Sequence, residues 1–277
     1  MIARLLLLFA MVVAPLASAA AETLTVMTYN VRYPSPDDGA DRWENRRDLL
    51  GDTIRKSAPD LIGTQELFQS QGDYITAKLP RYSWFGIDRR GGHDDEHMGI
   101  FYRSDRLKLI EQGNFWLSDT PEVVGSISWG HPLPRMVNWG LFETRSGRRF
   151  RLYNTHFPYR GEDEAARTKA ARLIAERISA DDGIPAILTG DFNTGDDSEA
   201  HRTLTETLSD SWTTAKRRSG PTPGYHGFNG GEPDRRIDWI LSRGFDAISA
   251  RSIDAALGGH YPSDHYPLVT KLRFAKP

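Results

Sequence analysis

Polar residues stand at the ends of several apolar stretches of this 277-residue chain. In chain order they are Asn30, Glu66, His156, Asp191, Asn193, Asp238, Asp264 and His265. Carboxylates and carboxamides beside apolar runs are costly to bury unless something satisfies them, and one divalent cation would satisfy several at once. Because the chain contains no cysteine, these oxygen ligands favour a hard ion such as Mg²⁺ or Mn²⁺ over structural zinc.

Each of these residues also has an ordinary structural explanation when it is considered alone. Asn30 could close a turn, and Glu66 could pair with an arginine. A single histidine such as His156 is more often packed or hydrogen-bonded than catalytic. The same kind of polar residue nevertheless ends one apolar strand after another, and this repeated pattern indicates a shared site.

The segments that must position these residues show the periodicities of strands and helices. Residues 23–30 alternate apolar and polar side chains, as a half-buried strand does, and residues 162–179 repeat apolar side chains at helical spacing. We predict further strands at 60–66, 98–103, 149–157, 184–188, 237–241 and 268–274, and a further helix at 43–56. Strands and helices mixed along one length predict a layered α/β domain, with sheet packed on sheet and helices outside.

The composition excludes several classes of protein. Lys and Arg number 35 against 37 Asp and Glu, a net charge of −2, which excludes a generic polyanion-binding surface. The absence of cysteine removes disulfides, thiol nucleophiles, iron–sulfur clusters and thiolate zinc sites. Hydrophobic residues make up 39% of the chain, so we predict one folded domain with a full core.

The N-terminal segment predicts export. Arg4 precedes an apolar run over residues 5–16, and Ala17-Ser18-Ala19 fits the small-residue pattern of a cleavage site. We therefore predict a signal peptide at residues 1–20, a domain at residues 21–277 and a secreted or periplasmic protein. An uncleaved N-terminal anchor is the alternative. No later apolar stretch is long enough to span a bilayer, so we expect no stable membrane insertion.

An ordered set of motifs runs from about Leu24 to the C-terminus. The motifs are Met-Thr-Tyr-Asn30-Val, Gly-Thr-Gln-Glu66, Asn-Thr-His156-Phe, Thr-Gly-Asp191-Phe-Asn193, Arg-Ile-Asp238-Trp and Pro-Ser-Asp264-His265-Tyr-Pro-Leu. This set resembles the endonuclease/exonuclease/phosphatase superfamily, the DNase-like metallophosphoesterases, and residues 30–33, 43–47 and 129–139 look like an exported bacterial branch of it. The resemblance implies a four-layer α/β sandwich, in which two mixed β-sheets pack face to face and helices flank them. It also implies Mg²⁺-dependent hydrolysis of a phosphoester.

The resemblance further implies how the metal and the attacking water are held. Glu66 would be the metal carboxylate, with Asn30 and Asp264 near the ion. Asp191 would position and deprotonate the water, and Asn193 would orient that water or the scissile phosphate.

Hydrogen-bond donors to the phosphoryl group complete the implied catalytic set. His265 would donate to a phosphoryl oxygen, and Asp238 would hold its imidazole in one tautomer. His156 would be a second donor to the phosphate.

Three further residues are candidates for substrate contact. Arg32 and Arg135 could each bind a substrate phosphate, or could instead pair structurally with a carboxylate such as Glu44 or Glu143. His226 stands in a Gly/Pro-rich loop that could touch the leaving group.

The segment Gly91–His97 gathers two histidines and three acidic residues. These side chains could hold a second metal, but we predict a polar, glycine-containing loop at the rim of the site.

The favoured function is an exported, monomeric, Mg²⁺-dependent hydrolase of a small phosphodiester or phosphomonoester. The alternative is a secreted nuclease, which would bind DNA or RNA as a substrate and not as a stable partner. It is disfavoured by the excess of acidic residues and by the lack of a basic and aromatic groove. A sphingomyelinase-like phospholipid phosphodiesterase would need an exposed apolar hairpin, and the sequence shows no convincing one. An inactive binding module is the least favoured, because the whole polar set is present.

Overall fold

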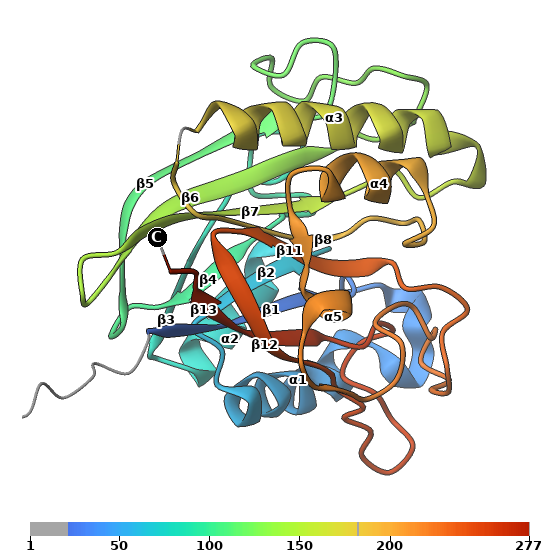
Figure 1. Ribbon diagram of the computed structural model, residues 1–277. Coiled ribbons are helices and arrows are strands. Elements are labelled where there is room, and N and C mark those ends of the chain that lie inside the picture. Colours follow the sequence, from blue (N-terminus) through green and yellow to red (C-terminus); the bar gives the residue numbers. More distant parts are fainter. Residues whose placement is uncertain (1–21, 182, 277) are drawn as a thin grey trace, which may run out of the picture.

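The computed structural model describes residues 22–181 and 183–276, which form two packed β-sheets with helices outside (Figure 1). The seven-stranded sheet has the order β10 (Arg218–Ser219), β12 (Phe245–Ser252), β13 (Leu268–Phe274), β1 (Thr23–Asn30), β2 (Leu61–Gln65), β4 (Ile100–Arg103) and β3 (Tyr82–Phe85). The six-stranded sheet has the order β5 (Leu107–Trp116), β6 (Met136–Thr144), β7 (Arg149–His156), β8 (Ala186–Asp191), β11 (Asp238–Arg243) and β9 (Ser209–Asp210). Both sheets are mixed, since β1 is parallel to β2 but antiparallel to β13, and β8 is parallel to β7 but antiparallel to β11.

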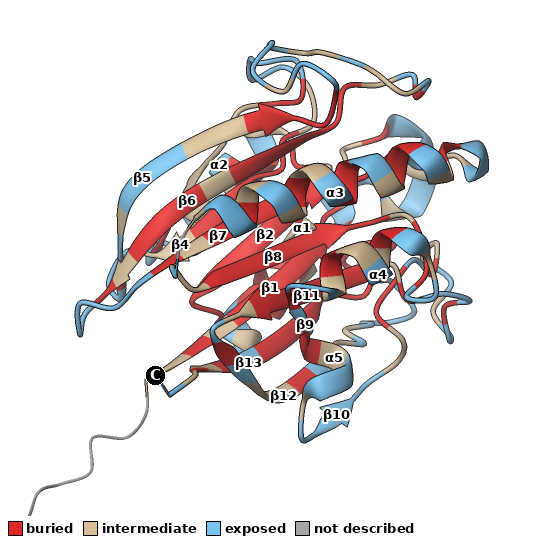
Figure 2. Ribbon diagram, turned by 45° about the horizontal axis from the view of Figure 1, so that its top comes forward, coloured by how far each residue is buried: buried red, intermediate tan, exposed pale blue. Residues whose placement is uncertain are grey.

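Three apolar layers hold the sandwich together. The layer between the sheets contains Leu24, Leu61, Phe150, Ile187 and Leu268 among its buried side chains. Helices α1 (Trp43–Ser57) and α2 (Gln69–Lys78) bury apolar side chains against the seven-stranded sheet, and α3 (Glu164–Ala180) and α4 (Glu199–Thr205) do so against the six-stranded sheet. Figure 2 shows the central strands buried and the outward face of α3 exposed. The predicted four-layer α/β sandwich is therefore confirmed.

Between the sheets, the side chains change from apolar to polar toward one end of the central strands. Along β1 they are Leu24, Val26, Thr28 and Asn30, along β7 they are Phe150, Leu152, Asn154 and His156, and along β8 they are Ile187, Thr189 and Asp191. Every second residue of a strand lies on the same face, so the period of two that buries the apolar residues also turns these polar residues inward. Gln65 of β2 donates a 2.7 Å hydrogen bond to Asn154 Oδ1 of β7 and so joins the two sheets at this polar end. Thr189 of β8 donates a 3.0 Å hydrogen bond to the same oxygen within the six-stranded sheet.

Several element boundaries differ from the prediction. Helix α3 begins at Glu164 because Gly161–Asp163 form a separate 3₁₀ turn, η2. Strand β8 extends to Asp191 and is paired with β11 so that Asp191 lies opposite Asp238. Strand β5 was not predicted because it is an edge strand with many exposed side chains, and β6 was not predicted because it is buried on both faces and shows no alternation.

The remaining elements are short. They are η1 (Pro36–Asp41) and α5 (Ser211–Thr214). The predicted signal peptide lies outside the described residues. Among residues 22–181 and 183–276, no helix is long and apolar enough to cross a membrane.

Candidate active site

Asp191 is the centre of the polar cluster at the end of the sandwich. It is the last residue of β8 and is almost fully buried. Its Oδ2 lies 3.5 Å from Nε2 of His156 and 3.7 Å from Nε2 of His265, so the carboxylate is flanked by two imidazoles. Asn30 Nδ2 donates a 3.0 Å hydrogen bond to the same oxygen. The arrangement brings together residues from β1, β7 and β8 with the segment that precedes β13.

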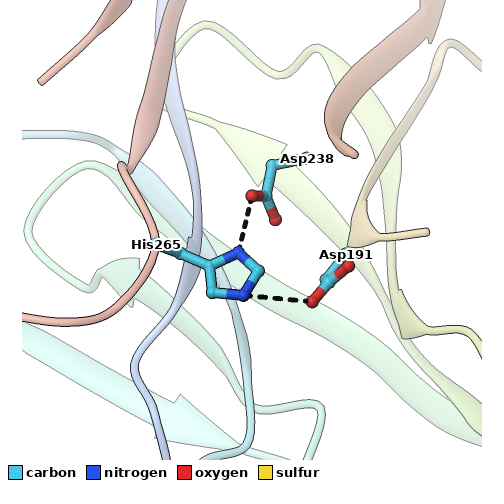
Figure 3. Close-up of side chains that lie close together, drawn as sticks. All are labelled: Asp191, Asp238 and His265. Atoms are coloured by element: carbon cyan, nitrogen blue, oxygen red, sulfur yellow. Dashed lines mark hydrogen bonds and ion pairs between the residues drawn. The ribbon is translucent and has the colours of Figure 1, made fainter. Parts of the chain in front are cut away.

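His265 is bound to a second buried carboxylate on its other side. Its Nδ1 lies 2.8 Å from Asp238 Oδ2, and the three side chains form the chain Asp238–His265–Asp191 (Figure 3). Burial opposes a charge on the imidazole, but Asp238 and Asp191 outweigh it and raise the pKa of His265 to about 10. At neutral pH His265 is therefore a cation whose orientation is fixed by Asp238.

The other two titrating groups of the cluster shift in different ways. Burial raises the pKa of Asp191 to about 6, although the charge of His265 acts against this shift. Burial and then the charges of Arg135 and His265 lower the pKa of His156 well below its usual value. The site thus combines an ionised carboxylate, a charged imidazole and a neutral imidazole at pH 7.

Glu96 belongs to the same cluster and was not predicted as a site residue. Its Oε2 lies 4.0 Å from His156 Nδ1 and 2.9 Å from Arg89 Nη1. Burial and the nearby charge of Glu66 raise the pKa of Glu96 to about 7. The sequence contained a signal, because Glu96 is one of the acidic residues of the Gly91–His97 loop, but only the fold shows that it faces His156.

The histidines of the Gly91–His97 loop do not join its carboxylates. His93 Nδ1 lies 3.1 Å from His97 Nε2, and His97 Nδ1 is bonded to the Leu67 carbonyl. Asp95 and Glu96 instead line the central cavity. Within the described part of the chain, the one cluster of acidic and histidine side chains with metal-ligand spacing is Asp191, Asp238 and His265. The loop therefore forms part of the cavity wall, as predicted for the rim.

Three residues of the site have backbone conformations that are unusual for side chains other than glycine. Arg32, Glu66 and Asn193 have φ values of 53°, 58° and 52°. Two of these backbones are held by hydrogen bonds to site residues, because Arg32 N–H donates to Asn30 Oδ1 and Asn193 N–H donates to Asp191 Oδ1. Such strain is retained where the surrounding structure over-determines it, which is common at functional sites.

Glu66 and Asp264 form the oxygen-rich side of the cavity. Arg32 Nη1 lies 3.9 Å from Glu66 Oε2, and Arg32 Nε lies 3.8 Å from Asp264 Oδ2. Burial and the charge of Asp264 raise the pKa of Glu66. The partly buried Glu66 and the buried Asp264 repel each other, and this pair suits a hard divalent cation because only oxygen ligands are involved. Asn30 lies beside them but presents Nδ2 to Glu66 Oε1, while its oxygen accepts from Arg32 N–H.

The cluster of Asp191, Asp238 and His265 is a poorer cation site than the pair of Glu66 and Asp264. His265 Nδ1 and Asp238 Oδ2 are already bonded to each other. A charged imidazole also has no lone pair for a metal. The chemistry of this cluster is therefore better suited to proton transfer and hydrogen-bond donation, and that of the carboxylate pair to cation binding.

The cavity around these residues has a volume of about 880 Å³. The predicted residues that line it are Arg32, Glu66, Arg135, His156, Asp191, Asn193, Asp264 and His265. Arg32 forms a bidentate pair with Asp38, at 2.7 and 3.1 Å, and not with Glu44. Arg135 is buried on the wall, and its Nη1 has no hydrogen-bond acceptor among the described residues.

His226 does not line the cavity. Its ring stacks on Tyr266 with centroids 4.0 Å apart, and its Nδ1 accepts a hydrogen bond from Gly230 N–H. The neighbouring Tyr225 and Phe228 line the cavity instead. The loop predicted to touch the leaving group therefore does reach the cavity, but Tyr225 and Phe228 line the cavity in place of the predicted His226.

The four-layer sandwich gathers carboxylates, an Asp–His pair and a second imidazole at one end of its inner strands, a set of groups suited to the hydrolysis of a phosphoester. Residues 27–265 match the Endonuclease/Exonuclease/phosphatase family, and the chain belongs to this family.

Solved structures show the same architecture. A family protein from Bacteroides thetaiotaomicron is 31% identical with a TM-score of 0.87, and the match covers 93% of this chain and 100% of that one. A mannosyl-6-phosphatase from the same organism is 31% identical with a TM-score of 0.85, and the match covers 91% of this chain and 100% of that one. An uncharacterized protein of Acanthamoeba polyphaga mimivirus is 33% identical over 168 residues, which span 56% of this chain and 60% of that protein.

Proposed function

We propose that the chain is an exported, monomeric, Mg²⁺- or Mn²⁺-dependent hydrolase of small phosphoesters, with phosphomonoesters favoured over diesters. One observation carries the proposal. The buried guanidinium of Arg135, whose Nη1 lacks an acceptor among the described residues, lies on the wall of the cavity that contains Asp191 and the two imidazoles. A buried, unpaired donor of this kind calls for an anion, and the terminal oxygens of a phosphomonoester supply more negative charge than a diester does.

The side chains divide the hydrolytic work between them. Asp191, with a pKa of about 6, is ionised at neutral pH and accepts a proton from the attacking water. His265, with a pKa of about 10, remains charged and donates from Nε2 to a phosphoryl oxygen as negative charge develops there. Asp238 acts through His265, because it fixes the ring from the opposite nitrogen.

His156 and Asn193 orient the reacting groups in this proposal. His156 is neutral, so it donates one hydrogen bond without adding a second positive charge beside His265. Asn193 holds Asp191 through its backbone N–H, and its Nδ2 donates to the Phe157 carbonyl, which leaves its oxygen available to the water.

Glu66 and Asp264 would hold the divalent cation. A bound Mg²⁺ supplies Lewis-acid polarisation of the phosphoryl group and compensates its charge. The positive charge of Arg32 lies beside the two carboxylates and offsets part of their negative charge. Its bidentate pairing with Asp38 fixes the position of the guanidinium.

The charges of the wall favour a small substrate over a nucleic acid. Arg32 is paired with Asp38, and Arg89 is paired with Asp95 and Glu96. Arginines that are already neutralised add little attraction for an extended polyanion, which is normally held by several unpaired cations along its backbone. The similarity to a mannosyl-6-phosphatase supports the same preference.

The function is tested by a hydrolysis screen of the purified protein with Mg²⁺. The substrates are p-nitrophenyl phosphate, bis-p-nitrophenyl phosphate, plasmid DNA and a lipid phosphodiester, each at about 50 and 200 mM salt. We expect the monoester to be cleaved best, with little dependence on salt. Efficient plasmid cleavage that falls steeply with salt would replace the proposal with a nuclease.

Export rests on residues 1–20 and is tested separately. Expression of the full chain with an epitope tag, followed by cell fractionation and N-terminal sequencing, should give a protein that starts near Ala20 outside the cytoplasm. A cytoplasmic protein that retains its N-terminus would contradict the export assignment.

A further inference from the structure

Exposed aromatic side chains are concentrated at the cavity. Among the described residues, the aromatic residues (Phe, Trp and Tyr) that are exposed to solvent are Tyr159 and Tyr225, and each is 56% exposed. Both line the cavity. Tyr225 also packs against the ring of His265, whereas Tyr159 follows His156 by three residues in the chain.

Tyr225 is held in a fixed place beside the catalytic centre. Its ring meets the His265 ring edge-on, with centroids 5.4 Å apart at an angle of 65°. The backbone around it is bonded along residues 264–266, because His226 N–H donates to the Asp264 carbonyl and Tyr266 N–H donates to the Gly224 carbonyl. A side chain at Gly227 would come within 3.0 Å of Tyr225 Oη, and the glycine leaves room for the ring.

A positioned aromatic ring that remains more than half exposed inside a cavity has apolar surface available for a ligand. The cavity volume of about 880 Å³ is far larger than a phosphate group requires, so the leaving group also lies inside it. The edge contact with His265 puts Tyr225 beside the imidazole that donates a hydrogen bond to the phosphoryl group. The first ring of a leaving group would lie in this place.

We propose that Tyr225 determines specificity by packing against a sugar ring of the leaving group. Hexose 6-phosphates and nucleoside 5′-monophosphates both contain such a ring. The inference rests on the proposed phosphomonoesterase function and names the leaving group for that site. Tyr225 contacts the leaving group and takes no part in proton transfer.

The test compares a cyclic substrate with its open-chain counterpart. Glucose 6-phosphate and glucitol 6-phosphate carry the same phosphate and the same number of carbons, but only glucose has a ring. Adenosine 5′-monophosphate is the second ring substrate. KM and kcat are measured for the wild type, Tyr225→Ala, Tyr225→Phe and the control Leu257→Ala, which truncates a side chain that is 69% exposed and outside the cavity lining.

We expect Tyr225→Ala to raise KM for at least one ring substrate by about 5-fold or more, the lower end of what stacking on an aromatic side chain contributes. The same variant should leave kcat and the constants for glucitol 6-phosphate unchanged, because contact with a ring is made equally in the ground and transition states. Tyr225→Phe should retain the preference for the ring, and Leu257→Ala should match the wild type. The ring substrate whose KM rises in Tyr225→Ala shows whether the sugar ring belongs to a hexose phosphate or to a nucleotide.

Equal losses of Tyr225→Ala on cyclic and open-chain substrates, or a fall confined to kcat, would overturn the inference and assign Tyr225 to the support of His265. The proposed function fails in a different way, namely if the wild type cleaves none of these monoesters. Melting temperatures of all variants, measured first, show that each is folded.

Discussion

Nδ1 of His265 lies 2.8 Å from Oδ2 of Asp238, and both side chains are buried at the point where the two sheets meet. This contact fixes which imidazole nitrogen faces Asp191 and keeps the ring charged. It joins the first residue of β11 to the segment before β13, and so links one sheet to the other.

Because Asp238 acts through His265, the effects of removing the two side chains should not add. Asp238→Asn and His265→Ala should each lower kcat on the order of 10²–10⁴-fold. The double variant should be little slower than His265→Ala, as is usual for residues that act as a unit. Asp246→Asn, which changes an exposed carboxylate paired with Arg273, is the matched control and should be neutral. Additive losses in the double variant would show that the two residues act independently.

Asp191 should titrate well above an ordinary aspartate. Burial raises its pKa to about 6, compared with about 3.9 for a model aspartate, so it should lose its proton near pH 6 in protein freed of divalent cations. Carboxyl ¹³C NMR of labelled protein measures this midpoint directly. In Asn30→Ala the midpoint should rise further, because the hydrogen bond from Asn30 stabilises the ionised form. A midpoint near 4 in the wild type would contradict the burial argument.

Activity should depend on a divalent cation held at Glu66. EDTA should abolish hydrolysis, and Mg²⁺ or Mn²⁺ should restore it while Ca²⁺ alone should not. Glu66→Gln should raise the Mg²⁺ concentration needed for half-maximal activity at least about tenfold, a loss within the range of metal-site variants. Glu143→Gln removes a carboxylate outside the cavity lining and serves as control. Full activity in EDTA would remove the cation from the mechanism.

Arg135→Met should make the protein more stable and less active. A buried guanidinium whose Nη1 has no acceptor costs stability, and methionine fills similar space without the charge, so the melting temperature should rise. The loss of a charge-assisted contact should lower kcat/KM for a phosphomonoester roughly 10- to 100-fold. Arg89→Met is the comparison variant. Arg89 is paired with Asp95 and Glu96, so its replacement should lower the melting temperature. A lower melting temperature for Arg135→Met would show that Arg135 is structural.

Asp210 should stabilise the fold in a pH-dependent way. Its carboxylate lies 2.6 Å from Arg236 and 2.9 Å from His201. Burial opposes ionisation, but His201 and Arg236 outweigh it and lower the pKa of Asp210. A lowered pKa gives stability that is present above the unfolded value of about 3.9 and is lost as the pH falls through the folded value.

Asp210→Asn should therefore lower the free energy of unfolding by about 2 kcal/mol at neutral pH, since it removes the buried carboxylate partner of Arg236 and leaves only the half-exposed Asp196 to pair with it. The difference from the wild type, measured by urea unfolding, should shrink below about pH 4. Glu199→Gln, in the exposed pair with Arg202, should change stability by no more than about 1 kcal/mol. A difference that is independent of pH down to acid unfolding would contradict the charge-based explanation.

The pattern of residues along the central strands is enough to predict which of their side chains point into the sandwich. Alternation along β1 and the apolar runs of β7 and β8 place Asn30, His156 and Asp191 on the side that buries Leu24, Leu152 and Ile187. Local periodicity sets this facing, and parallel pairing of β7 with β8 then brings His156 level with Asp191. For this reason the strand-end residues could be predicted to meet.

The loop residues that face the cavity could not be predicted in this way, because their direction depends on how the packed sheets hold the loops. Tyr225 pairs antiparallel with His265, and neighbouring residues of a paired segment point to opposite sides, so Tyr225 faces the cavity while His226 packs on Tyr266. Glu96 reaches His156 because Arg89 and the Gly91–His97 loop fold over the end of β7. Arg135 lies on a strand-to-loop junction whose burial depends on neighbours distant in sequence. Loops lack a periodic pattern that fixes the direction of a side chain, and their contacts exist only once the two sheets have packed.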